Sequence, residues 1–161
     1  MMNTLAIHLI VNGKDYLVDS APNRTLLDIL REDLGLTGVK QACAGTGECG
    51  ACMVIMNGEA TNSCLVLAGQ ADGARIETIE GVAKEGDLHP LQRAFIELGN
   101  VQCGFCTPGM IMSAKALLAH NPDPSEGQIQ EALSGNLCRC TGYSHMVEAV
   151  QKAAREMRNE S

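Results

Sequence analysis

Apolar and polar residues alternate in two short runs at the start of the chain, and the spacing then becomes helical. The alternating runs are Thr4–Val11 and Asp15–Ser20, and Asn12-Gly13 between them is typical of a tight β-hairpin turn. After Thr25, a capping residue, apolar positions recur with helical spacing as far as Gly35, which favours a helix end. The pattern predicts two antiparallel strands followed by a short helix.

The chain between this helix and residue 80 alternates between loop and strand patterns. Gly38–Gly50 is rich in glycine and carries cysteines, which indicates a loop. Met53–Met56 is a short apolar strand that turns at Asn57-Gly58, and Arg75–Ile79 is a further strand. Strands, one helix and a cysteine loop in this order fit a β-grasp arrangement.

The second half of the chain has helical spacing. Residues 81–88 are largely polar and contain glycine, as expected of a linker. Four helices follow, at Pro90–Leu98, Pro108–His120, Glu126–Ser134 and His145–Arg158. Thr107 and Ser125 provide capping hydroxyls in front of the second and third of them. The sequence therefore predicts an α+β protein, with a β-grasp domain over residues 1–80 and a small four-helix bundle over residues 89–161.

The composition is unusual for a small globular protein. Hydrophobic residues make up 45% of the chain, but there is no Trp and only two Phe and two Tyr, whereas Gly and Cys number 17 and 8. Such a chain needs something besides apolar packing to hold it together, and a bound inorganic centre would serve. The formal net charge of −7 argues against nucleic-acid binding, which normally requires a basic surface.

The sequence also bears on where the protein works. No apolar stretch is long enough to span a membrane. The N-terminal residues lack the cationic region and the cleavage site of a secretory signal. We therefore expect a cytoplasmic protein without a membrane span. In that reducing compartment the eight cysteines are not expected to form disulfides.

The eight cysteines fall into two groups of four, one in each half of the chain. The first group has the spacing Cys-x5-Cys-x2-Cys-x11-Cys and consists of Cys43, Cys49, Cys52 and Cys64. A plant-type ferredoxin places three thiolates as Cys-x4-Cys-x2-Cys with a distant fourth, so the first step here is one residue longer. Glycines in the loop let its backbone N–H groups approach an anionic cluster.

The second group consists of two close pairs with 31 residues between them. These pairs are Cys103-x2-Cys106 and Cys138-x-Cys140. Each lies just before a predicted helix, where free N–H groups and the helix dipole favour an anion. Two helix starts that converge on one anionic cluster form a physically reasonable site.

Structural zinc, a redox-active pair and unligated cysteines each account for less of this pattern. Structural zinc also uses four thiolates, but its pairs are typically separated by about two to four residues, unlike Cys138-x-Cys140. A redox-active Cys-x-x-Cys at Cys103 and Cys106 leaves the last pair without a role. Unligated buried cysteines account for one or two of the eight rather than two quartets. We therefore favour two iron–sulfur clusters over structural zinc.

Three motifs around these cysteines resemble the iron–sulfur subunit of the xanthine oxidase family of molybdenum hydroxylases. They are Cys49–Cys52 (CGAC), Gln102–Met110 (QCGFCTPGM) and Gly135–Tyr143 (GNLCRCTGY). The resemblance runs from about Thr4 to Lys152. It implies a ferredoxin-like β-grasp domain followed by a four-helix bundle, the same architecture that the residue pattern predicts.

The resemblance also implies a role for each cysteine. The outer [2Fe–2S] cluster would be bound by Cys43, Cys49, Cys52 and Cys64, and the inner one by Cys103, Cys106, Cys138 and Cys140. Gln102 would hydrogen-bond the pterin of a molybdenum cofactor, and Cys140 would contact the edge of the same pterin. Relatives usually have four residues between the first two cysteines where this chain has five, Ala44–Glu48, so we expect different hydrogen bonds around the outer cluster.

For the complex as a whole, the resemblance implies an electron-transfer subunit. A large partner subunit would carry molybdopterin, or its cytosine dinucleotide, and hydroxylate the substrate. Electrons would pass through the inner and the outer cluster toward FAD on a medium subunit or toward another acceptor, in a dimer of heterotrimers. We expect the substrate to be an N-heterocycle or a purine; an aldehyde, carbon monoxide and an aromatic-CoA thioester are alternatives. A free-standing two-cluster carrier and a zinc-stabilised interaction module are alternatives from other functional classes.

Overall fold

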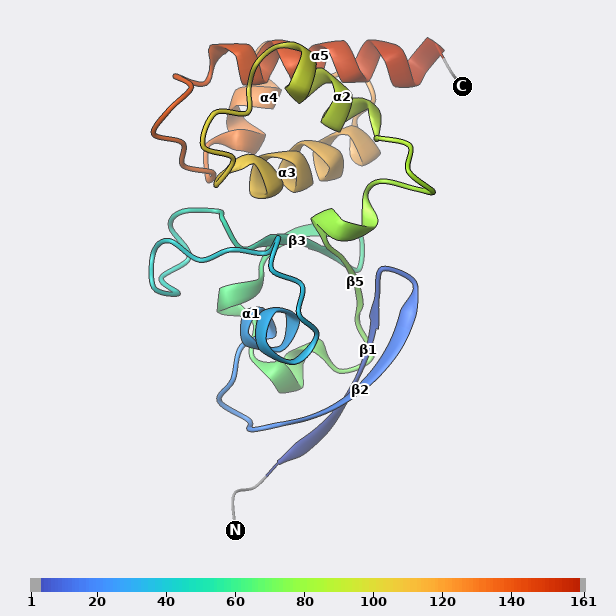
Figure 1. Cartoon of the computed structure of the whole chain (residues 1–161), viewed down its shortest axis with the longest axis vertical. Helices are drawn as coiled ribbons and strands as arrows, with labels where there is room; N and C mark the ends of the chain where they lie inside the picture. The colour runs from blue at the N-terminus through green and yellow to red at the C-terminus, as the bar shows by residue number, and fades with distance from the viewer. Residues whose placement is uncertain (1–3, 160–161) are drawn as a thin grey trace.

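The computed structural model describes residues 4–159 and has an α+β fold, as the sequence predicts (Figure 1). Residues 1–3 and 160–161, the outer ends of the two predicted domains, lie outside the described residues. Within the described part of the chain, all five strands belong to the N-terminal half and the four longest helices to the C-terminal half. Figure 1 shows these helices as a layer above the sheet.

The strands form one mixed sheet in the order β2-β1-β5-β3-β4. They are β1 Leu5–Val11, β2 Lys14–Ser20, β3 Met53–Met56, β4 Glu59–Asn62 and β5 Arg75–Glu77. β1 and β5 run parallel, whereas the other neighbouring strands are antiparallel. The first strand is therefore paired with the last, which is consistent with a ferredoxin-like fold.

The β1–β2 hairpin turns at the predicted residues. Asn12 and Gly13 both have positive φ, 51° and 79°, as a type I′ turn requires. The Asn12 side chain also binds the chain after β5, because its nitrogen donates to the Thr78 hydroxyl and its oxygen accepts the Thr78 N–H, each at 2.9 Å. These bonds replace strand pairing, so β5 ends before the predicted Ile79. The next residues form a 3₁₀ turn, η4 (Ile79–Gly81).

The predicted first helix forms but is not regular. Thr25 is its N-cap, in a capping box with Asp28. α1 covers only Leu26–Asp28, and η1 (Ile29–Asp33) continues it as a wider π-helix that ends before Gly35, where φ is 70°. Four apolar side chains of this segment are buried in one core with the sheet: Leu26, Leu27, Ile29 and Leu30.

Four helices make up the C-terminal half: α2 Pro90–Glu97, α3 Thr107–His120, α4 Glu126–Leu133 and α5 Ser144–Asn159. The Ser125 hydroxyl caps α4 in a capping box with Gln128, as predicted. The prediction that Thr107 caps α3 is wrong. Cys106 already has helical φ and ψ and is the N-cap, so the Thr107 hydroxyl lies inside the first turn and caps nothing. None of the helices among residues 4–159 is long and apolar enough to cross a membrane.

Helix α3 joins the two halves because it lies across β3 (Figure 1). Ile55 of β3 belongs to the same buried apolar cluster as Phe95 of α2 and Met110 of α3. At the same junction, Lys115 of α3 and Glu77 of β5 form an ion pair at 2.7 Å. The sheet and the helices therefore share both packing and charge contacts, which hold the cysteine loops of the two halves in a defined relation.

Candidate iron–sulfur sites

The first site consists of Cys43, Cys49, Cys52 and Cys64. The loop that carries the first three cysteines contains several residues in the left-handed backbone conformation. The backbone φ is positive at four positions between the first and the third cysteine: Ala44 (53°), Gly45 (87°), Gly47 (80°) and Gly50 (66°). This winding directs the N–H groups of Glu48 and Cys49 at the Cys43 sulfur. An anionic cluster requires backbone donors of this kind around its sulfur ligands.

The thiols of the first site lie as two contacting pairs. The Cys43 pKa is lowered to about 5 by hydrogen bonds from the Thr46 side chain and the Cys49 thiol. Burial raises the Cys64 pKa to about 12, and contact with the Cys52 thiol adds to the increase. Only Cys43 is partly exposed, since the other three thiols are buried. The pairs are thus Cys43 with Cys49, and Cys52 with Cys64.

Gly47 contributes to this site through its backbone. A Cβ atom at this position would lie 2.6 Å from Cδ1 of Leu65, but Leu65 is exposed and its side chain can move away. The Gly47 N–H donates to the Cys64 thiol. The positive φ of 80°, rather than space, is therefore what favours glycine here.

The second site combines cysteines from two loops of the helical half. Cys103 lies in the loop before α3 and Cys140 in the loop before α5, and their sulfurs are 3.6 Å apart. Cys106 and Cys138, from the same two loops, form the other contacting pair. Cys106 is at the N-cap position of α3, without a capping hydrogen bond from its side chain, but α5 begins only at Ser144, after the loop has turned again. Only one of the two expected helix starts therefore lies directly at the site.

Opposite pKa shifts occur within each pair of the second site. Burial raises the Cys106 pKa to about 12. Burial also acts to raise the Cys138 pKa, but hydrogen bonds from the Thr141 hydroxyl, 3.1 Å from the sulfur, and from backbone N–H groups lower it overall. A backbone N–H lowers the Cys103 pKa, and the contact with Cys103 raises that of Cys140. Within each pair, one thiol therefore loses its proton more readily than the other.

Contact in pairs fits a two-iron cluster better than a single ion. In a [2Fe–2S] cluster each iron binds two of the four cysteines. A structural zinc ion instead gathers four ligands around one point. At both sites the thiols meet two by two.

Two buried polar atoms beside the second site have no hydrogen-bond partner among the described residues. They are the side-chain oxygen of Asn100 and the hydroxyl of Thr107, which lie in the sequence on either side of Cys103 and Cys106. A buried hydroxyl without a partner is costly, and a cluster sulfide bound next to Cys106 would accept a hydrogen bond from it. Paired thiols and an available donor fit an anionic iron–sulfur cluster.

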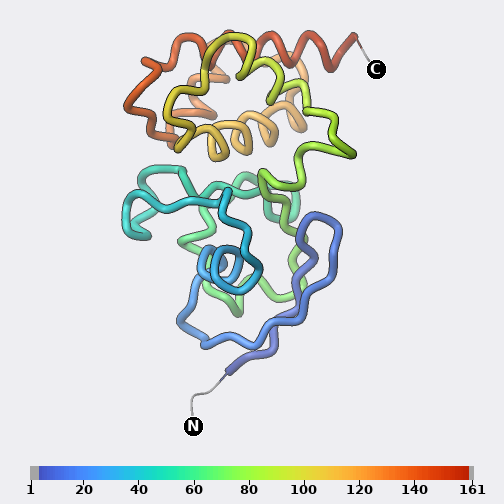
Figure 2. Tube along the Cα trace, in the orientation of Figure 1, coloured from blue at the N-terminus to red at the C-terminus, as the bar shows by residue number. Residues whose placement is uncertain are grey.

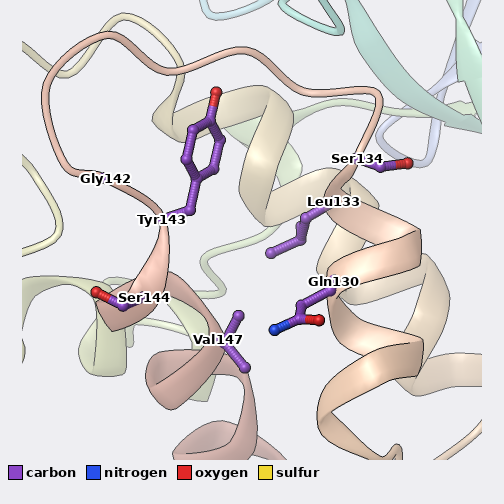
Figure 3. A pocket seen from close by; sticks show the side chains of 7 residues that line it. All are labelled: Gln130, Leu133, Ser134, Gly142, Tyr143, Ser144 and Val147. Atoms are coloured by element: carbon purple, nitrogen blue, oxygen red, sulfur yellow. The ribbon is translucent and has the colours of Figure 1, made fainter.

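Tyr143 supports the second site, although the sequence pattern assigned it no role. Its φ of 71° is unusual for an aromatic residue, and its hydroxyl accepts the Cys138 N–H at 2.7 Å. Figure 3 shows its ring beside a cavity of 450 Å³ between α4 and α5, with the hydroxyl pointing away from Val147. The only sequence signal for this role is its place at the end of the third motif.

Both halves of the chain match known iron–sulfur domains. Residues 9–80 match a 2Fe-2S iron-sulfur cluster binding domain, and residues 78–151 match a [2Fe-2S] binding domain. The nicotinate dehydrogenase small FeS subunit of Eubacterium barkeri is 54% identical over 158 residues, which is 98% of this chain and 100% of the relative. The chain belongs to the small iron–sulfur subunits of the molybdenum hydroxylase family.

Two solved structures have the same fold as this small iron–sulfur subunit. Quinoline 2-oxidoreductase from Pseudomonas putida 86 contains a chain that is 42% identical, with a TM-score of 0.92 and 97% of each chain covered. Aldehyde oxidoreductase from Desulfovibrio desulfuricans ATCC 27774 also gives 0.92, at 45% identity, over 97% of this subunit and 17% of its own chain. The predicted function is therefore confirmed: an electron-transfer subunit with [2Fe–2S] clusters that works with a large partner subunit in a molybdenum hydroxylase.

Gln102 and Cys140, the residues expected to contact a pterin, both lie at the surface of the small iron–sulfur subunit. Cys103, next to Gln102, is exposed as well. Large apolar side chains of the same two loops are also exposed: Val101, Phe105, Leu137 and Tyr143. A partner can therefore reach the second site directly from this side, whereas three of the four thiols of the first site are buried.

Lys40 and Asn136 link the two sites, and neither was expected to do so from the sequence. The Lys40 ammonium donates to the Gly104 carbonyl at 3.4 Å and lies 5.5 Å from the centre of the Phe105 ring. Asn136 is buried between the first cysteine loop and α3. Both contacts join segments that are distant in the sequence, so no local pattern could have predicted them.

Proposed function

We propose that the first site holds the outer [2Fe–2S] cluster and the second site the inner one. Each iron would be bound by one contacting pair of thiolates, namely Cys43 with Cys49, Cys52 with Cys64, Cys103 with Cys140, and Cys106 with Cys138. The pairwise contact of all eight thiols at two sites is the observation that supports this assignment. Bound clusters supply reversible storage of single electrons, and the residues of this chain determine their spacing and their hydrogen bonds.

A large molybdopterin-binding subunit would dock at the exposed edge of the second site. Gln102 would hydrogen-bond the pterin there. Cys140 would lie against the pterin edge, and electrons would enter this subunit through it. The cofactor would be molybdopterin or its cytosine dinucleotide. Support comes from the exposure of both residues and from the apolar side chains around them, which docking would bury.

Electrons would leave through the first site to FAD on a medium subunit. Cys43 is the partly exposed thiol of this site, and several residues of its loop are exposed, which gives a partner access: Ala44, Thr46 and Glu48. We propose a dimer of such heterotrimers as the complete assembly. The eight free cysteines are compatible with the reducing cytoplasm that we propose as its location.

An N-heterocycle, such as a pyridine, a quinoline or a purine, is the substrate class that we propose for the complex. The support is the nicotinate dehydrogenase relative, which is matched over its own whole length by 98% of this subunit, together with the quinoline 2-oxidoreductase structure. The similar aldehyde oxidoreductase keeps an aldehyde as the alternative. Turnover of nicotinate, xanthine and benzaldehyde by the purified complex distinguishes these classes.

The chain would fold as two domains, residues 1–80 and residues 89–161, joined by a linker at residues 81–88. One buried apolar cluster is built from the sheet and the first helix, and a second is built mainly from the later helices. Within the second part, α2 packs on α5 and α3 packs on α4. These contacts support a four-helix bundle of α2 to α5.

Iron analysis and EPR of the dithionite-reduced protein test the cluster assignment. We expect about four iron atoms per chain and two distinguishable [2Fe–2S] signals. Cys138→Ala should remove one signal and Cys52→Ala the other, while Ser134→Ala, at an exposed position near the second site, should keep both. Zinc in place of iron, or a single signal from the unmodified protein, would reject the assignment. Co-purification with a larger chain separates a subunit from a free-standing carrier, which would run as a monomer.

A further inference from the structure

Three segments that are far apart in the sequence meet at the side chain of Asn136. They are the first cysteine loop at Gly50, helix α3 at Ser113, and the loop before α5, which carries Asn136 itself. The Asn136 side-chain nitrogen donates to the Gly50 carbonyl at 3.0 Å, and its oxygen accepts the Ser113 hydroxyl at 2.7 Å. Figure 2 shows the first cysteine loop and the loop before α5 projecting from the same side of the molecule.

Burial and donor chemistry leave the Asn136 amide one orientation. Asn136 is 2% exposed and Ser113 is 3% exposed. The Gly50 carbonyl can only accept, so the NH₂ group must face it, and the amide oxygen then faces the Ser113 hydroxyl, which can donate. The loss of either bond would leave a buried polar group without a partner, which makes both bonds difficult to break separately.

The segments approach one another too closely for a side chain at two glycines. A Cβ atom on Gly50 would lie 2.4 Å from the Asn136 side-chain nitrogen and 2.4 Å from the Gly135 carbonyl oxygen. A Cβ atom on Gly109 of α3 would lie 2.3 Å from the Gly50 carbonyl oxygen. The backbones are therefore in direct contact, and the hydrogen bonds of Asn136 hold them at one separation.

The same segments carry the cysteines of both sites. Gly50 directly follows Cys49, Asn136 lies two residues before Cys138, and α3 begins directly after another cysteine of the second site. Between these points the Leu137 N–H donates to the Cys49 carbonyl at 3.0 Å. A short path thus joins Cys138 of the second site to Cys49 of the first. It runs along the backbone to Leu137 and through one hydrogen bond to Cys49, and it passes beside the buried Asn136 side chain.

We propose that Asn136 is a positioning residue that sets the separation and the electronic coupling of the two clusters. The proposal rests on the ligand assignment given above. In the step concerned, one electron passes from the reduced inner cluster to the oxidised outer cluster. One ferrous ion of the inner cluster becomes ferric, one ferric ion of the outer cluster becomes ferrous, and no bond is made or broken. The electron itself comes from the molybdenum subunit, and Asn136 acts only through the two loops that it joins.

EPR of the fully reduced protein, purified with its partner subunits, tests this role. With both clusters reduced, two unpaired spins lie close to each other, and we expect their interaction to split the signals of the unmodified protein. In Asn136→Ala we expect both [2Fe–2S] signals to remain and the splitting to be lost. A residue that only stabilised the fold would lower the unfolding temperature without changing the splitting in the cluster-loaded protein.

Two further variants make the test decisive. Asn121→Ala removes an amide at the other end of α3 that bonds Gln128 in a solvent-accessible position, and it should leave the splitting unchanged. Ser113→Ala removes one of the two partners of Asn136 and should weaken the splitting. If Asn136→Ala does not bind both clusters, Ser113→Ala decides the question by the same criterion. Unchanged splitting in a fully loaded variant overturns the proposal, whereas only one cluster in the unmodified protein overturns the ligand assignment instead.

Discussion

At the scale of single residues, both cysteine sites depend on backbone conformations and contacts that few side chains allow. Gly50 has a φ of 66° and no room for a Cβ atom. Gly58, in the turn between β3 and β4, has a φ of 93° with open space around it. A side chain would strain the backbone at both positions but would clash only at Gly50. Alanine at each position therefore separates strain from close packing.

Gly50→Ala should destabilise the protein by roughly 3 kcal/mol or more, because the methyl group adds a clash with Asn136 to the backbone strain. Gly58→Ala should cost about 1 kcal/mol, from strain alone. Urea denaturation of the two variants measures the difference, and iron content shows whether the first site still binds its cluster. Equal losses of stability in the two variants would show that the close contact at Gly50 does not contribute to the destabilisation.

Thr107 offers a second test on a single residue, because its buried hydroxyl has no partner among the described residues. A hydroxyl that donates to the inner cluster would stabilise the more negative, reduced state. Thr107→Val should therefore lower the reduction potential of that cluster by on the order of 50 mV. Thr107→Ser keeps the hydroxyl and should leave the reduction potential at its wild-type value. Redox titration followed by EPR measures both potentials, and the outer cluster serves as the internal reference. A Thr107→Val protein with an unchanged inner potential would show that the hydroxyl does not donate to the cluster.

At the scale of secondary-structure elements, two helices of the C-terminal half, α2 and α4, are stabilised at their starts by capping side chains. His89 caps α2, since its Nδ1 accepts the Leu91 N–H at 3.2 Å and Gln92 closes the capping box. Burial, and then the nearby Lys115, lower the His89 pKa. The ring is therefore neutral in the folded protein at neutral pH, as its role as an acceptor requires.

His89 makes the stability of α2 depend on pH. Because its folded-state pKa lies below the ordinary value of 6.5, the unfolded chain binds more protons than the folded protein between the two values. The contribution is complete above pH 6.5 and is lost as the pH falls below it. We expect a loss of up to about 1 kcal/mol, the usual contribution of an N-cap. His89→Asn retains a capping acceptor that does not titrate.

Thermal unfolding of the wild type and of His89→Asn, followed from about pH 8 to about pH 5, measures this contribution. The variant should lose less stability than the wild type over the acid part of the range. Identical pH profiles would show that the protonation of His89 is not coupled to folding.

At the scale of the whole molecule, the two sites bring together chain segments that are otherwise joined only by long connections. The second site links the loop before α3 to the loop before α5, where the Cys103 and Cys140 sulfurs lie 3.6 Å apart. The first site joins its loop to Cys64, beyond β4. Bound iron at either site would therefore constrain tertiary structure as well as carry electrons.

Removal of the iron with a chelator should destabilise the protein by about 3 kcal/mol or more, because the binding free energy of each cluster contributes to folding. Cys138→Ala, which should lose only the inner cluster, gives the more specific test. Hydrogen exchange should increase in the loops before α3 and α5 but not in the β1–β2 hairpin. Uniform exchange rates before and after iron loss would show that the clusters do not stabilise these loops.

Local signals in the sequence were sufficient for most of the elements. Asn12-Gly13 predicted the hairpin and Ser125 predicted the start of α4, because turn and cap preferences depend on a few neighbouring residues. The strand β4 was not predicted, although the turn before it was, because Glu59–Asn62 is mainly polar and lacks the apolar alternation that marks a strand. The role given to Thr107 was wrong because the helix starts one residue earlier than its local pattern indicates.

The sequence by itself determined the family, the α+β organisation and the division of eight cysteines into two quartets, because residue spacing and motif residues are properties of the chain alone. Only the tertiary structure decided which thiols meet in pairs, which polar atoms are left without partners, and that Asn136 fastens one cysteine loop to the other. These features arise where segments far apart in the chain pack at atomic distance. Hydrogen bonds and steric exclusion at that range depend on the folded backbone, which no local pattern of residues encodes.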